Sequence, residues 1–177
     1  MPSLACAHRP EPDWRLSRFD ALTPRELQFI YMARQRVFAI EQQCIYLDVD
    51  GCDESAHHLA AWSTAQQEPL AYARLLAPGV KYAEPSIGRV ITTERARGTG
   101  LGRELVARAI AACSDLHPGQ GIRISAQSRL EAFYQSQGFR PIGSRYLEDG
   151  IDHTEMLRAW DGSADPTFPT GTNPAPG

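Results

Sequence analysis

The stretch SIGRVITTERARGTGLGREL, residues 86–105, decides the fold of this chain. The apolar, β-branched run from Ile87 to Thr92 indicates a strand, and a glycine-rich turn follows at Arg97–Gly102. Apolar residues then recur at the spacing of a helix face, at Leu101, Leu105, Ala109 and Ala112. A strand, a glycine turn and a helix start offer backbone N–H groups and a positive dipole end to a phosphate. The stretch therefore predicts a seat for a ligand that carries a diphosphate.

The spacing of the glycines excludes two common phosphate-binding motifs. The dinucleotide fingerprint G-x-G-x-x-G would need a glycine at Arg103 or at Leu105, and neither position has one. The nucleotide-triphosphate loop needs a lysine after its last glycine, but Lys81 is the only lysine and lies upstream. A turn that merely lets a helix pack closely on a strand stays open as an alternative.

The composition indicates one domain between two tails. The chain has 177 residues, 42% of them hydrophobic, which suits a single packed domain at residues 14–160. Residues 161–177 hold four prolines and three glycines, so we expect a flexible C-terminal tail there, and residues 1–13 form a similar N-terminal tail.

Charge and cysteine usage narrow the classes of partner. A net charge of −3 argues against binding to nucleic acid, and no apolar run is long enough to span a membrane. The N-terminal residues lack the apolar core of a secretion signal, so we expect a cytoplasmic location. The cysteines form no CxxC pair and no zinc-like spacing with histidine, so we expect no metal: Cys6, Cys44, Cys52 and Cys113.

The remaining elements alternate between helix and strand. Capping boxes predict helix starts at Thr23 and at Ser128, and Gly138 is a typical helix stop. The long helix after the glycine turn should end near Ser114. Besides residues 86–92, we expect strands at 58–62, 70–76, 122–127, 139–144 and 153–160. This order predicts a mixed α/β sheet with the glycine turn at the carboxyl end of a central strand.

Two motifs together resemble the GNAT family of N-acetyltransferases. The first is R-x-x-G-x-G at Arg97, Gly100 and Gly102, and the second is AFYQSQGF at residues 132–139. They follow each other in the family's order and lie on the expected elements. Further stretches resemble the ElaA-type branch, so that the resemblance covers nearly all of residues 14–156: 36–59, 71–76, 87–90 and 146–156.

The resemblance implies a single-domain, mostly antiparallel sheet flanked by helices, with a cleft for acetyl-CoA where central strands splay apart. Gln127 stands where the family often has asparagine and is expected to contact CoA. The backbone of β-strand residues Val90, Ile91 and Thr92 is expected to pair with the pantetheine amides like an added strand. The diphosphate is expected on the backbone of Arg97, Gly98, Thr99, Gly100, Leu101 and Gly102.

Tyr134, in the second motif, is the expected catalytic residue. The attack of an amine on a thioester expels a thiolate, which benefits from a nearby proton donor. A tyrosine with a pKa of about 10 is protonated at neutral pH and can serve as that donor. In the family, the tyrosine of this motif commonly has this role. A purely structural role beside Phe133 and Phe139 is the alternative.

The general base is left unassigned by the sequence. An alkyl ammonium group is neutral only in a tiny fraction at pH 7, and recovering the free amine costs about 4.6 kcal/mol. Some carboxylate, histidine or water chain should therefore assist. Five residues in polar segments are candidates, and no spacing singles one out: Glu41, His58, Glu148, Asp149 and His153.

The distribution of charged residues along the sequence gives information on the acceptor of the acetyl group. The segments between Arg36 and Arg74 and between Arg145 and Arg158 contain several carboxylates and no cation. If both flank the acceptor pocket, they favour a cationic amine on a small molecule or a peptide; two solvated acidic loops are an equal alternative. Arg74 and Arg89 suit an ion pair and a functional role equally. A homodimer is compatible with the sequence.

Two other functions compete with the acetyltransferase. A catalytically inactive acyl-CoA-binding sensor would keep the same fold and the donor site, although the intact Tyr134 argues against it. The RVFAIEQ stretch at residues 36–42 faintly resembles acyl-homoserine-lactone synthases, which would need an acylated carrier protein and S-adenosylmethionine. The glycine turn favours acetyl-CoA over that second alternative.

Overall fold

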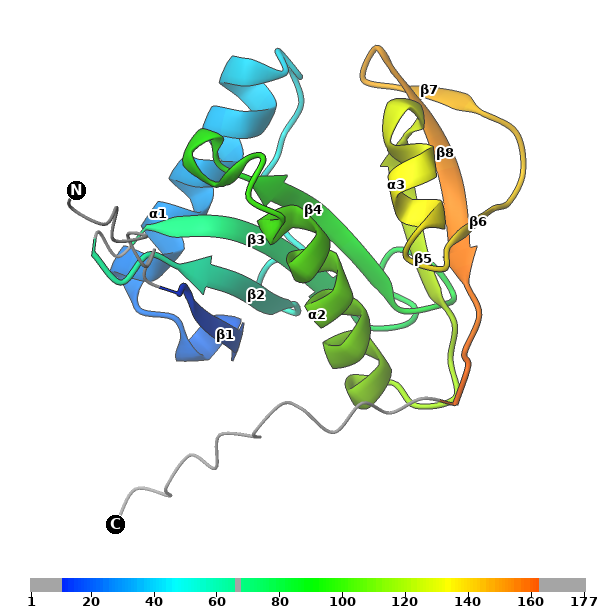
Figure 1. The fold of residues 1–177 in the computed structure, drawn as a ribbon, viewed down its shortest axis with the longest axis horizontal. Coiled ribbons are helices and arrows are strands. Elements are labelled where there is room, and N and C mark those ends of the chain that lie inside the picture. Colours follow the sequence, from blue (N-terminus) through cyan, green and yellow to red (C-terminus); the bar gives the residue numbers. More distant parts are fainter. Residues whose placement is uncertain (1–10, 66–67, 163–177) are drawn as a thin grey trace, which may run out of the picture.

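One eight-stranded sheet organises the molecule (Figure 1). A computed structural model describes residues 11–65 and 68–162, so most of both expected tails lies outside the described residues. Along the sheet the strands follow the order β1-β2-β3-β4-β5-β8-β6, and β7 pairs with β8. The strands are β1 (Asp13–Arg18), β2 (His57–Trp62), β3 (Pro69–Leu76), β4 (Ser86–Thr92), β5 (Ile122–Gln127), β6 (Arg140–Pro141), β7 (Tyr146–Glu148) and β8 (Ile151–Arg158).

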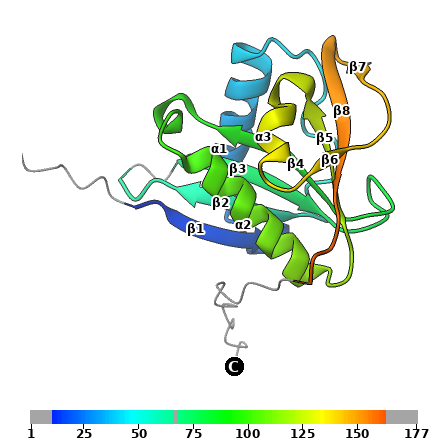
Figure 2. The same ribbon diagram turned by 45° about the vertical axis from the view of Figure 1, so that its right-hand side comes forward.

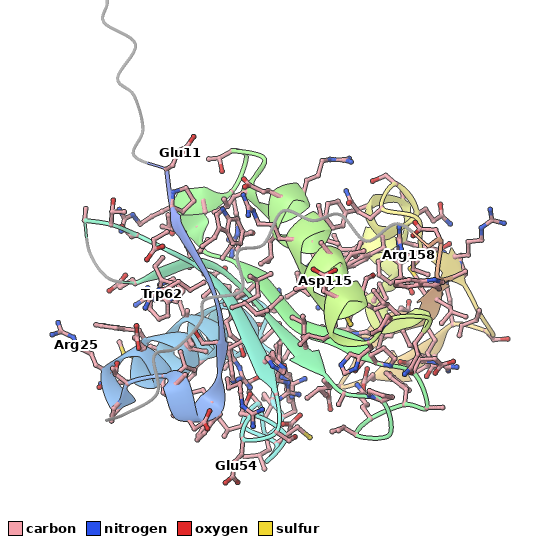
Figure 3. The ribbon with its side chains drawn as sticks, turned by 90° about the horizontal axis from the view of Figure 1, so that it is seen from below. Glu11, Arg25, Glu54, Trp62, Asp115 and Arg158 are labelled. Carbon is pink, nitrogen blue, oxygen red and sulfur yellow. The ribbon has the colours of Figure 1, made fainter. Side chains whose placement is uncertain are left out.

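The helices cover both faces of this sheet. They are α1 (Pro24–Gln35), α2 (Leu101–Leu116) and α3 (Glu131–Gln135). Because side chains alternate along a strand, β2 contributes Leu59 and Ala61 to the core under α2, and Ala60 and Trp62 to a second core under α1. Figure 2 shows α3 on the same side as α2, and Figure 3 shows Trp62 on the side of α1.

The N-terminal helix begins as the sequence predicts. The amide of Glu26 donates to Thr23 Oγ1 at 3.2 Å, and the Glu26 carboxylate accepts the amide of Thr23 at 2.9 Å. This reciprocal capping box satisfies two N–H groups that a helix start leaves unpaired. Beyond α1 the chain widens into a π-helix at Arg36–Glu41, in which the amide of Gln42 donates to the carbonyl of Val37. Such turns often lie beside functional sites.

Strands β4 and β5 are parallel but joined at one end only. Their single register pair is Ser86 with Arg123, and from there the two strands diverge (Figure 1). On its other edge β4 pairs with β3 through a β-bulge, where Arg89 adopts a φ of +52°. Bulges redirect side chains and are common beside active sites. The expected splay of central strands is thereby confirmed.

Two local expectations need correction, and two features of the sheet were not expected. Ser128 caps no helix, because its Oγ lies 3.0 Å from Thr154 Oγ1 and α3 begins three residues later at Glu131. The strand expected at residues 139–144 contracts to Arg140–Pro141, and β1 was not expected at all. The β7–β8 hairpin was also missed, although Asp149-Gly150, with φ values of +51° and +80°, is a strong signal for a two-residue turn.

A buried ion-pair network ties the segment before β2 to the sheet. Arg34 of α1 is fully buried, and its Nη1 lies 2.7 Å from Asp53 Oδ1. The same oxygen lies 3.1 Å from Arg74 Nη1 of β3, and Arg74 also holds the Asp50 carboxylate with two hydrogen bonds of 2.6 and 2.7 Å. Buried charges need such partners, because an unpaired one costs several kcal/mol.

Within the described ranges, 11–65 and 68–162, none of the helices has the length and apolar character to cross a membrane.

Replacing Asp53 by asparagine should destabilise the fold, because two buried guanidinium groups then lose a negative partner. We expect the free energy of unfolding in urea to fall by about 3 kcal/mol. The matched change Asp20→Asn affects an exposed carboxylate paired with Arg18 and should cost less than about 0.5 kcal/mol. A loss below about 1 kcal/mol for Asp53→Asn would contradict a stabilising role for the network.

Candidate active site

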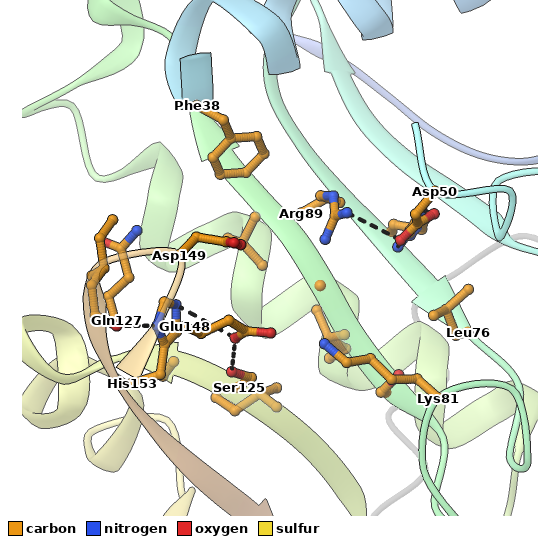
Figure 4. A pocket seen from close by; sticks show the side chains of 18 of the residues that line it. Phe38, Asp50, Leu76, Lys81, Arg89, Ser125, Gln127, Glu148, Asp149 and His153 are labelled. Carbon is orange, nitrogen blue, oxygen red and sulfur yellow. Dashed lines mark hydrogen bonds and ion pairs between the residues drawn. The ribbon is translucent and has the colours of Figure 1, made fainter. Parts of the chain in front are cut away.

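A cavity of about 520 Å³ lies where β4 and β5 separate. Residues 87–90 of β4 form one wall and residues 124–127 of β5 form the other. The segment after the π-helix, the connection between β3 and β4, the β7–β8 hairpin and Tyr134 of α3 complete the lining. Figure 4 shows Ser125, Glu148 and His153 gathered on one side of it and Arg89 with Asp50 on the other.

The glycine turn has the geometry of an anion site. Gly98 and Gly100 have φ values of +72° and +85°, and a Cβ at either position would meet no atom within 4 Å, so their backbone faces open space. Among the described residues, the amides of Gly98, Thr99, Gly100 and Gly102 have no hydrogen-bond acceptor. The Leu101 amide makes only a 3.4 Å contact with Thr99 Oγ1. Free amides that open a helix fit a diphosphate.

Arg97 differs from the expectation in one respect. Its own amide already donates to the carbonyl of Glu94, so the free donors of the turn begin at Gly98. The side chain donates from Nε to the carbonyl of Thr92 at 3.2 Å and forms an ion pair with Glu41. The guanidinium therefore links the glycine turn to the end of the π-helix.

The residues expected to pair with pantetheine lie on β4, which has a free edge. Beyond the Ser86–Arg123 pair, no ladder joins β4 to β5 among the described residues. Val90 lines the cavity, whereas the Ile91 side chain is buried under α1 and its backbone pairs with Tyr72 of β3. The Thr92 carbonyl is occupied by Arg97. This edge can accept an extended ligand by strand addition.

Tyr134 reaches the cavity from the end of α3. Its ring packs edge-on against Phe133 and Phe139, with centroids 5.1 and 5.9 Å away, and its exposed fraction is 7%. Burial raises the pKa of the phenol to about 12, so the hydroxyl stays protonated at neutral pH. Within the part of the chain that the structure describes, this hydroxyl has no hydrogen-bond partner. Tyr134 is thus a donor without a partner.

Gln127 joins the two walls of the cavity. Its Nε2 donates to Gln42 Oε1 at 3.0 Å, on the segment after the π-helix, and its Oε1 accepts from Arg129 Nε at 2.9 Å. Gln127 lies at the carboxyl end of β5 and lines the cavity, a position that is compatible with the expected contact to CoA.

The five candidates for a general base separate into two groups. His58 is buried between the Tyr72 hydroxyl at 2.8 Å and the Asp53 carbonyl at 3.0 Å, and it does not line the cavity. Glu41 pairs with Arg97 and does not line it either. The other three lie on the β7–β8 hairpin and do line it: Glu148, Asp149 and His153.

Ser125, which lines the cavity, and Tyr146, which lies beside Ser125, were not expected from the sequence. Ser125 Oγ lies 2.5 Å from the Tyr146 hydroxyl and donates to Glu148 Oε2 at 3.1 Å. Alternation along β5 was the available signal, because Ser125 lies between Ile124 and Ala126, whose side chains enter the core. Tyr146 belongs to β7, which was not expected, so no signal placed it here.

The acidic segment between Arg36 and Arg74 was one of two expected to attract a cationic amine, but the structure uses its aspartates in ion pairs. Asp48, Asp50 and Asp53 are neutralised by arginines from elsewhere in the chain, namely Arg34, Arg74 and Arg89. Burial alone would raise the pKa of Asp50, but the hydrogen bonds from Arg74 lower it well below its ordinary value. Arg74 and Arg89 are thus ion-pair partners that also line the cavity. The second segment, by contrast, presents Glu148 and Asp149 to the cavity.

The residues that the structure describes contain no group of three or more histidine, cysteine or acidic side chains placed to hold a metal ion.

Known proteins match this chain along most of its length. A family model described as an acetyltransferase (GNAT) domain matches residues 32–159, a range that contains every residue lining the cavity. A UPF0039 protein of Synechocystis is 40% identical over 147 residues, which cover 83% of this chain and 95% of that protein. Escherichia coli ElaA is 35% identical over 148 residues, covering 82% of this chain and 95% of ElaA.

Solved structures show the same similarity. An acyl-CoA N-acyltransferase from Pseudomonas aeruginosa has a TM-score of 0.79 and 41% identity, with 84% of this chain and 99% of that chain covered. The crystal structure of Escherichia coli ElaA has a TM-score of 0.77 and 34% identity, with 83% and 99% covered.

Proposed function

The chain belongs to the GNAT family of acetyltransferases, and on this premise we propose that it transfers the acetyl group of acetyl-CoA to an amine. The acceptor is a primary amine on a small molecule or a peptide. One observation carries the proposal: the opening between β4 and β5 has free amide donors at the glycine turn and an unpartnered tyrosine hydroxyl inside.

The donor is held mostly by backbone. The amides of the glycine turn bind the diphosphate, and the free edge of β4 accepts the pantetheine arm. Each interaction with the helix dipole contributes only about 0.3–1 kcal/mol, so affinity requires several donors that converge. Arg97 adds a charged hydrogen bond once it leaves Glu41.

The acceptor nitrogen attacks the thioester directly. The C–N bond forms, the C–S bond breaks with its electron pair on sulfur, and the two protons lost by the ammonium end on the thiol and in water. Cys44, a buried thiol of the cavity, is a poor nucleophile, because burial and the charge of Asp149 raise its pKa. A ternary complex needs no covalent enzyme intermediate.

Tyr134 supports the departure of sulfur by a hydrogen bond. With a pKa of about 12, the phenol is several units less acidic than an ordinary thiol, so full proton transfer costs about 5 kcal/mol. Donating a hydrogen bond to the developing thiolate avoids that cost while still stabilising its charge.

The experiment that tests this function measures thiol release from acetyl-CoA across alkyl amines, polyamines, amino acids and peptide N-termini. We expect turnover with at least one class of cationic amine, because Glu148 and Asp149 face the cavity. Turnover confined to hydroxyl or thiol acceptors would contradict the amine. Tight acetyl-CoA binding without turnover would instead support the inactive sensor.

Replacing Gly100 by alanine should weaken donor binding. Both Gly100→Ala and the control Gly143→Ala place a side chain at positive φ, with φ values of +85° and +75°, at a cost of about 1–2 kcal/mol in stability. Only the first puts a methyl group in the space meant for the diphosphate. We expect acetyl-CoA affinity, measured by calorimetry, to fall about tenfold for Gly100→Ala alone. Equal affinities of the two variants would refute the glycine turn as the diphosphate-binding site.

Replacing Tyr134 by phenylalanine removes the hydroxyl and keeps the contacts of the ring with Phe133 and Phe139. We expect kcat to fall about 100-fold with acetyl-CoA affinity unchanged, because the donor acts on the departing sulfur. Tyr31→Phe, which removes the same atom from α1 outside the cavity, is the matched control and should leave kcat unaltered. Equal kcat values for both variants would exclude Tyr134 from catalysis.

A further inference from the structure

A polar cluster lies on the β7–β8 side of the cavity, away from the β4 edge that is proposed to bind the pantetheine arm. It joins Ser125 of β5, Tyr146 and Glu148 of β7, and His153 of β8. His153 Nε2 lies 4.0 Å from Glu148 Oε2, and the rings of His153 and Tyr146 are 6.1 Å apart. The cluster lies opposite β4, along which the thioester arm would extend (Figure 4).

The hydrogen bonds of His153 determine which ring nitrogen is basic. Nδ1 lies 2.9 Å from the carbonyl of Ile151, and a carbonyl oxygen can only accept. Nδ1 therefore carries the hydrogen of the neutral ring, and Nε2 keeps its lone pair. That lone pair is on the nitrogen nearest to Glu148, in a side chain that is 14% exposed.

A hydrogen-bond chain holds the carboxylate beside Nε2. Ser125 Oγ donates to Glu148 Oε2 at 3.1 Å, so the Tyr146 hydroxyl, 2.5 Å from Ser125 Oγ, donates in turn to the serine. These two hydrogen bonds fix the direction of the Glu148 carboxylate without neutralising its charge. A fixed negative charge next to an imidazole stabilises the imidazolium that forms when Nε2 accepts a proton.

The backbone keeps this cluster rigid. His153 pairs with Gln127 on one edge of β8 and with Tyr146 on the other, so its strand is held from both sides. The two-residue turn Asp149-Gly150 closes the hairpin within four residues of His153. Functional groups on paired strands hold their geometry better than groups on loops.

We infer that His153 is the general base that removes a proton from the acceptor ammonium. Glu148 is the positioning residue: its carboxylate lies beside Nε2 and balances the positive charge of the imidazolium that forms. This inference rests on the proposed function. The ammonium gives one proton to His153 Nε2, and the neutral nitrogen attacks the acyl carbon as described above. The nitrogen loses its second proton as the amide forms, the sulfur leaves as the thiol, and the imidazolium returns its proton to water.

Other ionisable groups share the cavity with His153. On the hairpin these are Glu148 and Asp149, and from the β3–β4 connection they are Lys81 and Tyr82. The Lys81 ammonium lies over the Tyr82 ring, 5.3 Å from its centroid. Asp149 contributes negative charge to the cavity but makes no hydrogen bond to His153 in the described structure, so Glu148 is the partner that the geometry supports.

The test compares His153→Gln and Glu148→Gln with the unaltered protein and an alkyl amine as acceptor. For His153→Gln we expect kcat/KM at pH 7 to fall about 100-fold, as is typical for loss of a general base. The deficit should shrink as pH rises, because solution then supplies free amine. For Glu148→Gln we expect kcat/KM to fall about tenfold with acetyl-CoA affinity unchanged, because the charge beside Nε2 is lost while the donor site stays intact.

Two controls separate this role from a structural one. Asp152→Asn removes an exposed carboxylate from the same strand, next to His153 but outside the cavity, and should change neither rate nor pH profile. Retained acetyl-CoA affinity of His153→Gln shows that the variant folds. A deficit of His153→Gln that stays constant with pH, or an unchanged kcat/KM for Glu148→Gln, overturns the inference. Absence of turnover in the unaltered protein would instead remove the proposed function itself.

Discussion

The structure depends on the incomplete pairing of β4 with β5. The two central strands share one register pair, Ser86 with Arg123, and beyond it their facing edges carry backbone groups that no neighbouring strand satisfies. Unpaired backbone groups are costly when they are buried, so this opening persists only because solvent or a ligand can reach it. Tyr134 lines this opening and the glycine turn follows the carboxyl end of β4, and the functional assignments follow from this arrangement.

The buried ion pairs explain how such an opening keeps its shape. Asp53 binds Arg34 of α1 and Arg74 of β3 at once, and Asp50 and Asp48 extend the network to Arg89 on the bulge of β4. Through these contacts the segment between the π-helix and β2 is attached to the first half of the sheet. These carboxylates are therefore structural, and in the proposed function the carboxylates that attract a cationic acceptor are those of the β7–β8 hairpin.

Local signals in the sequence predicted much of the fold. The capping box at Thr23 and the strands at residues 86–92 and 122–127 were confirmed, because neighbouring residues alone determine them. The Ser128 capping box failed because its hydroxyl prefers Thr154, a partner that no local pattern contains. The polar cluster around His153 could not be predicted for the same reason, because Ser125 and His153 come together only when β5 and β8 pair.

Hydrogen exchange of the backbone amides with and without acetyl-CoA tests the account most directly. The free N–H groups of the glycine turn and the open edge of β4 should bind the donor, so exchange should slow at residues 98–102 and along residues 88–92. The amides of β1, at the far edge of the sheet, should be unchanged. Protection elsewhere, with the turn still exchanging at its unliganded rate, would contradict the assignment of this opening as the acyl-CoA site.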